Sequence, residues 1–319
     1  MKQNPFHLTQ PIGFILLPGF ALMSYASATE PLRAANMLAG SALYEIVALS
    51  PDGAPVPSSS GATVPSRPLG QDAHDALHTV FVCAGGQPGE WRYPQVHATL
   101  RTLARSGVRI GGISGGPYLL AAAGLLDGRD FTIHWEHAPA LIEAFPHLVP
   151  RQARFVLDGN RITCGGGVAP LDMMHALIAE RMGADFARRV SDWYLHTAVA
   201  EPAAPQRASA AERFGVHHPA LLNVLAKMEA TIEQPLGRDS MAVFAGISPR
   251  HLDRLFADHL GRGFLETYRT IRLQHARRLL QQSPLSISEI AFATGFSSAA
   301  HFSTAYRRLF AHPPGQERS

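Results

Sequence analysis

The sequence predicts an α/β domain followed by an all-α domain, and three observations support this. Over residues 10–197, short apolar runs alternate with helical patterns, which is typical of a mostly parallel sheet with helices on both faces, a flavodoxin-like sandwich. Over residues 216–319 the apolar spacing is helical throughout. Residues 198–215 begin with a run rich in Ala, Pro, Glu and Ser, which is typical of a linker, although a frayed helix end fits the same composition.

The strands of the α/β domain are predicted from short apolar runs. The first four end close to Gly, Pro or Ser, as buried parallel strands do. Asp158-Gly159-Asn160 predicts a hairpin between the last two. The predicted strands are residues 12–17, 44–49, 80–83, 108–113, 131–133, 155–157 and 161–164, and later helices are expected at 170–182 and 186–194.

Charge is unevenly spread along the 319 residues. Residues 207–319 carry 14 Lys and Arg against 9 Asp and Glu, whereas residues 1–206 carry 14 against 16. A basic C-terminal part indicates a polyanion partner at that end, although a solvated charged face gives the same balance.

The remaining composition argues for a protein of the cytoplasm. The two cysteines, Cys83 and Cys164, lie in apolar runs and are expected to be buried thiols rather than a disulfide framework. We see no apolar run of membrane-spanning length, no secretory leader and no metal-ligand spacing, so we predict no membrane, cofactor or metal.

One pattern occurs twice in residues 241–310. A small residue is followed four positions later by Gly246 or Gly295 and then by Ser248 or Ser298. Gly allows a tight turn and Ser caps the next helix, so each copy predicts a helix-turn-helix. A predicted helix of 19 residues at 264–282, about 28 Å long, joins the two copies and carries four arginines.

Each copy predicts one helix that enters the major groove of DNA. In the first, Leu252, Leu255 and Phe256 share a face and are expected in the core. Arg250 and Arg254 lie on another face, and Arg is the usual bidentate reader of guanine. The alternative is that these arginines are only solvated. The candidate DNA-contacting residues are Ser248, Arg250, His251, Asp253 and Arg254 in the first copy and Ser298, Ala300, His301, Ser303 and Thr304 in the second.

The C-terminal third resembles the AraC/XylS family of transcription regulators. The resemblance is carried by residues 248–256, 272–280 and 287–296, together with His301-Phe302-Ser303. It implies seven helices in two subdomains, site-specific DNA binding, and usually activation of transcription with RNA polymerase as a partner. Thr304 departs from the family, which more often has Arg or Lys there, so we expect the first helix to dominate base reading.

Gly112-Ile-Ser114-Gly-Gly116 matches G-x-S-x-G, the strand-to-helix turn that exposes a nucleophile. Gly85 and Gly86 follow an earlier strand and could offer backbone amides to an oxyanion, and His134 could act as a base. These residues alone suggest a hydrolase or amidase that uses Ser114, fused to a DNA-binding domain.

A second resemblance argues against that chemistry. Residues 13–20, 30–36, 124–128 and 132–135 resemble the PfpI-like domain of the class I glutamine-amidotransferase superfamily. The enzymes of that superfamily have Cys at the elbow and a carboxylate nearby. Here Ser114 and Ser24 stand at these positions, and a serine hydroxyl is far less ionisable than a thiol. We therefore predict a degenerate, non-catalytic site.

The two domains together resemble a branch of the AraC/XylS family that regulates arginine, carnitine and glycine-betaine catabolism. The resemblance implies that the N-terminal pocket binds a small nitrogenous metabolite, and we expect the protein to be a homodimer. Amides at a helix N-terminus suit a carboxylate and aromatic faces suit a quaternary ammonium, although core packing explains the aromatic residues equally well. The candidate ligand-binding residues are Ser114, Gly115, Gly85, Gly86, His134, Trp135 and Tyr25.

The prediction is a ligand-responsive, sequence-specific DNA-binding regulator. The hydrolase at Ser114 is the main alternative. A non-specific DNA binder is a third, which the modest net charge of +3 disfavours.

Overall fold

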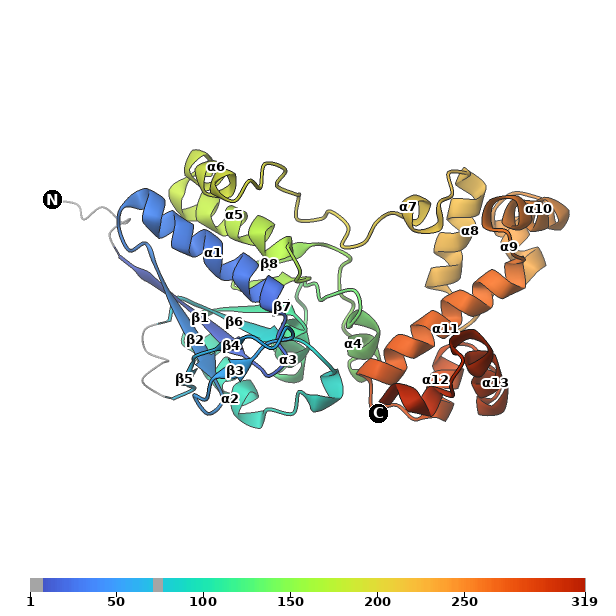
Figure 1. The fold of residues 1–319 in the computed structure, drawn as a ribbon, viewed down its shortest axis with the longest axis horizontal. Helices are drawn as coiled ribbons and strands as arrows, with labels where there is room; N and C mark the ends of the chain where they lie inside the picture. The colour runs from blue at the N-terminus through green and yellow to red at the C-terminus, as the bar shows by residue number, and fades with distance from the viewer. Residues whose placement is uncertain (1–7, 71–76, 319) are drawn as a thin grey trace. The chain divides into compact units, whose positions relative to one another are not determined.

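The computed structural model describes residues 8–70 and 77–318. The chain forms two compact units, Met1–Gln206 and Arg207–Ser319 (Figure 1). The first contains the β-sheet and the second is helical. The predicted combination of an α/β domain with an all-α domain is confirmed.

Within its described residues, the first unit is built on a seven-stranded sheet in the order β5-β2-β1-β6-β7-β9-β8. All neighbouring strands pair in parallel except β8 and β9. The five central strands follow the flavodoxin-like order, in which ligands bind outside the carboxyl ends of the strands. The strands are β1 (Gln10–Leu16), β2 (Tyr44–Ser50), β5 (Arg67–Pro68), β6 (Thr79–Ala84), β7 (Arg109–Ser114), β8 (Phe155–Asp158) and β9 (Arg161–Cys164), and β3 (Val56–Pro57) pairs with β4 (Thr63–Val64) outside this sheet.

Helices cover both faces of the sheet, as predicted. On one face α1 (Leu22–Ala39), α5 (Ala169–Met182) and α6 (Ala184–Trp193) pack together (Figure 1). On the other face lie α2 (Pro94–Arg105) and α3 (Gly116–Ala122). Two apolar cores result, one on each side, because alternate residues of the buried strands point to opposite faces. A 3-10 turn (Pro88–Glu90) precedes α2, and α4 (Ala138–Ala144) contributes to the second core.

The predicted strand at residues 131–133 is wrong. Thr132 makes hydrogen bonds that involve side chains instead of the backbone bonds of a strand pair. Its amide donates to Thr163 Oγ1 (2.9 Å). Its hydroxyl donates to the carbonyl oxygens of Arg151 (2.8 Å) and Ala153 (2.9 Å). The place beside β7 is taken by β9, which with β8 forms the predicted hairpin.

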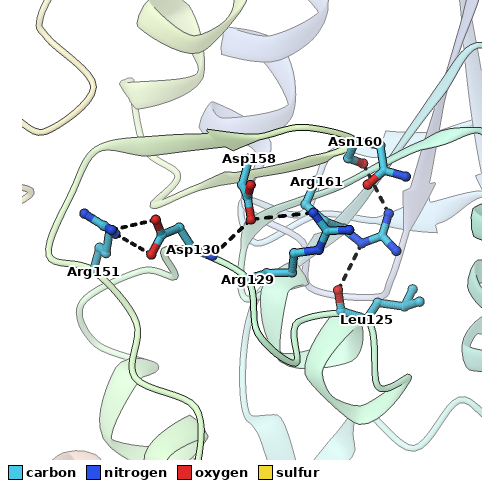
Figure 2. A network of polar contacts seen from close by, with 7 residues as sticks. All are labelled: Leu125, Arg129, Asp130, Arg151, Asp158, Asn160 and Arg161. Atoms are coloured by element: carbon cyan, nitrogen blue, oxygen red, sulfur yellow. Dashed lines mark hydrogen bonds and ion pairs between the residues drawn. The ribbon is translucent and has the colours of Figure 1, made fainter.

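One ion pair, Arg129 with Asp158 at 3.8 Å, and two hydrogen bonds hold this hairpin to the segment before residue 131 (Figure 2). Asp158 accepts a hydrogen bond from the Asp130 amide at 3.1 Å, and Asp130 forms a bidentate pair with Arg151. Arg161 is buried and donates to the Leu125 carbonyl at 3.0 Å. These contacts fix the path of the chain that leads to His134.

Over residues 207–318, the second unit has seven α-helices in two subdomains, as the resemblance implied. α11 runs through both: its first half packs with the first group of helices and its second half with the last two. The predicted helix at 264–282 is confirmed. The helices are α7 (Ala210–Phe214), α8 (Pro219–Ala230), α9 (Arg238–Phe244), α10 (Pro249–Leu260), α11 (Phe264–Gln282), α12 (Ile287–Ala293) and α13 (Ala299–Phe310), followed by a 3-10 turn (Pro314–Arg318).

Candidate functional site

The G-x-S-x-G segment forms the sharp strand-to-helix turn that its sequence predicts. Ser114 ends β7 with φ of 60°, a left-handed conformation that costs a non-glycine residue energy. Gly116 lets α3 approach the sheet, because a Cβ there would overlap the Val82 carbonyl oxygen. Ser114 itself is buried, with 7% of its surface exposed.

Three strand ends bring Ser24, Ser114 and Gly166 together. A Cβ added to Gly166 would lie 2.8 Å from the Ser114 Cβ and 3.0 Å from the Ser24 Oγ. Ser24 lies in the first turn of α1, the helix that follows β1, while Ser114 ends β7 and Gly166 follows β9, so the group lies at the carboxyl ends of parallel strands. The Ser24 hydroxyl accepts a hydrogen bond from the Gly167 amide (2.8 Å), which a carboxylate at this position could also do.

His134 is fixed beside the elbow, and its ring is not oriented as in a serine triad. Its amide donates to the Ser114 carbonyl at 3.2 Å. Its Nδ1 accepts from the Glu136 amide (3.3 Å), whereas a triad histidine donates from Nδ1 to a carboxylate. Burial lowers the pKa of His134, so the imidazole is neutral at pH 7, with its proton on Nε2. That nitrogen can donate a hydrogen bond but cannot accept a proton as a base.

The glycine amides at the elbow are partly engaged already. Gly115 donates to the Ala84 carbonyl at 3.0 Å. The Trp91 ring lies so close to Gly115 that a Cβ there would overlap it, and Trp91 Nε1 donates to the Gly85 carbonyl (3.1 Å). Gly86 is exposed with φ of 80°. Trp91 therefore forms one wall of the elbow.

Tyr25 packs into the core of the first unit. Its ring meets Phe14 and Phe20 edge-on at centroid distances of 5.5 and 5.6 Å. Burial raises its pKa to about 12. Trp135 is half-buried, and its ring lies 5.5 Å from that of His134.

Gln206, inside the predicted linker, is held at the edge of this site. Its Nε2 donates to Thr132 Oγ1 (2.9 Å) and to the carbonyl oxygens of Ile133 (2.9 Å) and Ala153 (2.7 Å). Its Oε1 accepts from the Trp135 amide at 2.8 Å. His134 directly precedes Trp135, and its amide donates to the Ser114 carbonyl. The elbow and the linker therefore share one short segment, residues 132–135.

Asp172 of α5 is a second anchor for the same part of the chain. Its side chain has 0% exposure and accepts from Arg154 at 2.7 and 2.8 Å. Its other oxygen contacts His196 Nε2 (2.8 Å) and accepts from the Ala200 amide (2.9 Å). Residues 196–206, which we call the docked segment, are thus fastened to the first unit at both ends. Sequence reasoning missed Asp172 and Gln206.

Both helix-turn-helix motifs have the predicted caps and turns. Ser248 and Ser298 each accept from the amide three residues later, at 3.2 Å. Gly246 and Gly295 have φ of 67° and 73°. A Cβ at Gly295 would lie 2.6 Å from the Ile232 carbonyl oxygen, so the second turn packs directly against the first subdomain.

On α10 the core face and the outer face divide as predicted. Leu252, Leu255 and Phe256 are buried, and Arg250 and Arg254 are exposed. His251 is half-buried, and Asp253 pairs with Arg238 at 3.1 Å. On α13, Ala300, His301 and Thr304 are exposed and Ser303 is half-buried, while the Thr304 hydroxyl donates to the Ala300 carbonyl (3.0 Å).

Two arginines of α11 support the second subdomain. Arg272 donates to the Thr294 carbonyl at 2.7 Å and lies over the Phe296 ring. Arg277 pairs with Glu317 at 2.8 Å and lies over the Phe310 ring. They hold the second helix-turn-helix in place.

Two classes of feature are absent from the part of the chain that the structure describes. Within residues 8–70 and 77–318, no helix is long and apolar enough to cross a membrane. The same residues contain no group of three metal-ligating side chains.

Family models match both units. The DJ-1/PfpI family model matches residues 12–180 and a helix-turn-helix domain model matches residues 241–319. Among solved structures, an AraC family transcriptional regulator from Pseudomonas putida is 29% identical with a TM-score of 0.54, covering 58% of this chain and 99% of that one. A ThiJ/PfpI family protein from Pseudomonas syringae, 23% identical with a TM-score of 0.53, covers 72% of this chain and 90% of that one and shares the fold.

Curated relatives match over nearly the whole chain. The HTH-type transcriptional regulator GlxA of Rhizobium meliloti is 71% identical over 97% of this chain and 95% of its own length. GbdR and CdhR of Pseudomonas aeruginosa, also HTH-type transcriptional regulators, are each 40% identical, over 99% and 98% of this chain and 85% and 92% of their own lengths. These relatives are regulators rather than enzymes. The chain belongs to the AraC-type helix-turn-helix transcription regulators that carry an N-terminal DJ-1/PfpI domain, and it is a DNA-binding regulator.

Proposed function

We propose that the first unit senses a small nitrogenous metabolite at the Ser114 elbow and controls DNA binding through the docked segment. The observation that carries this proposal is the segment 132–135. Its His134 amide binds the elbow carbonyl, and its backbone also holds Gln206 of the linker. A ligand that moves this segment changes the docking energy of the linker, which is the differential interaction that a population shift requires.

The chemistry of the site suits a small polar ligand. His134 offers an Nε2–H donor, Gly86 is exposed, and Trp135 lies beside the His134 ring. We propose as contacts the residues predicted from the sequence, without the Gly115 amide, which is already engaged. The resemblance to regulators of arginine, carnitine and glycine-betaine catabolism makes these three compounds the first probes. Homodimerisation, activation through RNA polymerase and a cytoplasmic location complete the proposal.

A thermal-shift experiment on the full chain tests the site. We expect at least one of the three compounds to raise the midpoint temperature of unfolding. His134→Ala should weaken the binding of that compound about tenfold, which is a loss of about 1.4 kcal/mol of binding free energy. His147→Ala is the matched control, because His147 is exposed and pairs with Asp127 away from the elbow. Equal weakening in both variants, or no stabilisation by any compound, would contradict a ligand site at the elbow.

Gln206→Ala tests the linker. The change removes four hydrogen-bond contacts, three of which share the two N–H groups of Nε2, and a full hydrogen bond contributes about 0.5–1.5 kcal/mol. We expect faster hydrogen exchange in residues 196–206. Gln87→Ala, at an exposed glutamine, should leave exchange in the docked segment unaltered. A Gln206→Ala protein that exchanges like wild type would show that Gln206 does not hold the linker.

Arg254→Ala tests base reading by the first recognition helix. Arg254 is exposed on the outer face of α10. We expect the substitution to weaken specific DNA binding by about 1–3 kcal/mol and to relax preference at one base position. Thr304→Ala, at the matching position on α13, should weaken specific DNA binding less, because the Thr304 hydroxyl already donates to the Ala300 carbonyl. Base-resolved binding measurements check both, and equal loss on specific and random DNA would argue for a phosphate contact instead.

A further inference from the structure

A cavity lies at the opposite end of the sheet from Ser114. It has a volume of about 210 Å³ and opens at the amino ends of β1, β2, β6 and β7, beneath α1 and α5. Arg109 at its mouth and Ser114 at the elbow are the first and last residues of β7, about 17 Å apart along an extended strand. The cavity is therefore separate from the site described above.

The inner walls of this cavity are apolar. Ile12, Phe81, Leu32 and Met174 are all at least nine-tenths buried, and Leu177 completes the wall from α5. An engineered apolar cavity of about 150 Å³ holds one benzene molecule. The body of a ligand here is thus limited to about six to eight carbon atoms by the same comparison.

The mouth of the cavity carries excess positive charge. Arg181 donates to two neutral carbonyl oxygens, those of Leu43 and Leu8, at 2.6 Å each. Arg109 meets Glu180 only at 3.3 Å, and that carboxylate is 58% exposed. Two guanidinium groups therefore face one exposed carboxylate. His78, also at the mouth, stays neutral because burial and both arginines lower its pKa.

Tyr44 supplies a second, independent observation. It forms part of the cavity wall and is 6% exposed, and the Arg181 guanidinium lies over its ring at 4.9 Å. Its hydroxyl is buried beside the Arg181 guanidinium and makes no hydrogen bond of standard geometry with the residues that the structure describes. A buried hydroxyl without a hydrogen bond of standard geometry is costly, and a ligand oxygen at this place would satisfy it.

We propose that this cavity binds a small aliphatic or aromatic monocarboxylate, whose apolar body lies between α5 and the sheet and whose carboxylate pairs with Arg109 and Arg181. One negative charge matches the excess at the mouth, and Arg is the side chain best suited to hold a carboxylate by two parallel bonds. The inference does not depend on the function proposed for the elbow. It gives the first unit a site for an organic acid at the other end of β7.

Methyl NMR of the full chain labelled at methionine tests this site, with hexanoate as the probe. We expect the Met174 methyl signal, assigned with Met174→Leu, to shift saturably with hexanoate and not with hexylamine. Met228 and Met241, buried in the second unit, are internal controls whose signals should stay in place. No saturable shift at Met174, or equal shifts with hexylamine, would overturn the proposal.

Two variants separate binding from folding. Leu177→Trp fills the cavity and Arg109→Gln removes one charge, and each should weaken hexanoate binding about tenfold or more. Arg105→Gln, at the exposed end of α2, is the matched charge control and should bind hexanoate like wild type. If Leu177→Trp fails to fold, the hexanoate affinity of Arg109→Gln alone tests the proposal. Unchanged hexanoate affinity in a folded Arg109→Gln protein would overturn carboxylate recognition.

Discussion

Asp172→Ala is expected to lower the unfolding free energy of the first unit by about 3–5 kcal/mol, the cost of breaking a buried ion pair from one side. The carboxylate is fully buried, and its loss leaves the Arg154 guanidinium without its charge partner. The same change frees His196 and the Ala200 amide, so the docked segment should also exchange its amide hydrogens faster. All three tryptophans, at 91, 135 and 193, lie in the first unit, so their fluorescence reports its unfolding alone.

Asp130→Ala is the matched control for that measurement. Asp130 also forms a bidentate pair with an arginine, Arg151, but both side chains are more than half exposed (Figure 2). An exposed pair contributes about 0–1 kcal/mol. Similar small losses in both variants would mean that the Asp172 cluster is no more stabilising than a surface ion pair.

Phe302→Ala is expected to destabilise the second helix-turn-helix by about 3–5 kcal/mol. Phe302 has 0% exposure, and its ring meets those of Phe296 and Tyr306 at 5.3 and 5.5 Å. The cavity left behind loosens α13 from α11, so specific DNA binding should fall as well. Hydrogen exchange in residues 299–310 measures the stability, and binding to the recognition sequence measures the function.

Phe292→Ala removes the same atoms from a neighbouring helix, α12. Phe292 is 58% exposed, and surface substitutions usually change stability by less than about 0.5 kcal/mol. If Phe292→Ala loosened α13 as much as Phe302→Ala, the core assigned to the second subdomain would be wrong. A loss of DNA binding by Phe292→Ala with α13 intact would instead identify Phe292 as a contact surface.

Local signals predicted most of the fold. Apolar runs of strand length located β1, β2, β6 and β7, and Ser248 and Ser298 marked the starts of α10 and α13, because a capping serine acts on its own helix. The incorrect strand at 131–133 has the apolar composition of a strand. Its Thr132 bonds to side-chain and carbonyl partners from 19 to 31 residues away, which no local pattern reveals.

The candidate site was predicted in part. The G-x-S-x-G spacing located the elbow, and the resemblance placed Ser24 beside Ser114, where the structure brings both against Gly166. The rest of the site depends on contacts between residues far apart in the sequence. Gln206 stands in an Ala- and Pro-rich run and Asp172 in the first turn of α5, and both have ordinary sequence surroundings. Their roles depend on partners such as Trp135 and Arg154, which only the folded chain brings near.

Coupling between the sensor and DNA binding is measured most directly with the full chain and a recognition sequence selected from random duplex DNA. Its affinity is compared with and without glycine betaine, carnitine or arginine, in wild type and in Gln206→Ala. At least one compound should change the wild-type affinity by about 5- to 150-fold, the usual range of allosteric coupling, and the change should largely disappear in Gln206→Ala while the compound still binds. An equal response in both proteins, or no response to any of the three compounds, would contradict control of DNA binding through the docked segment.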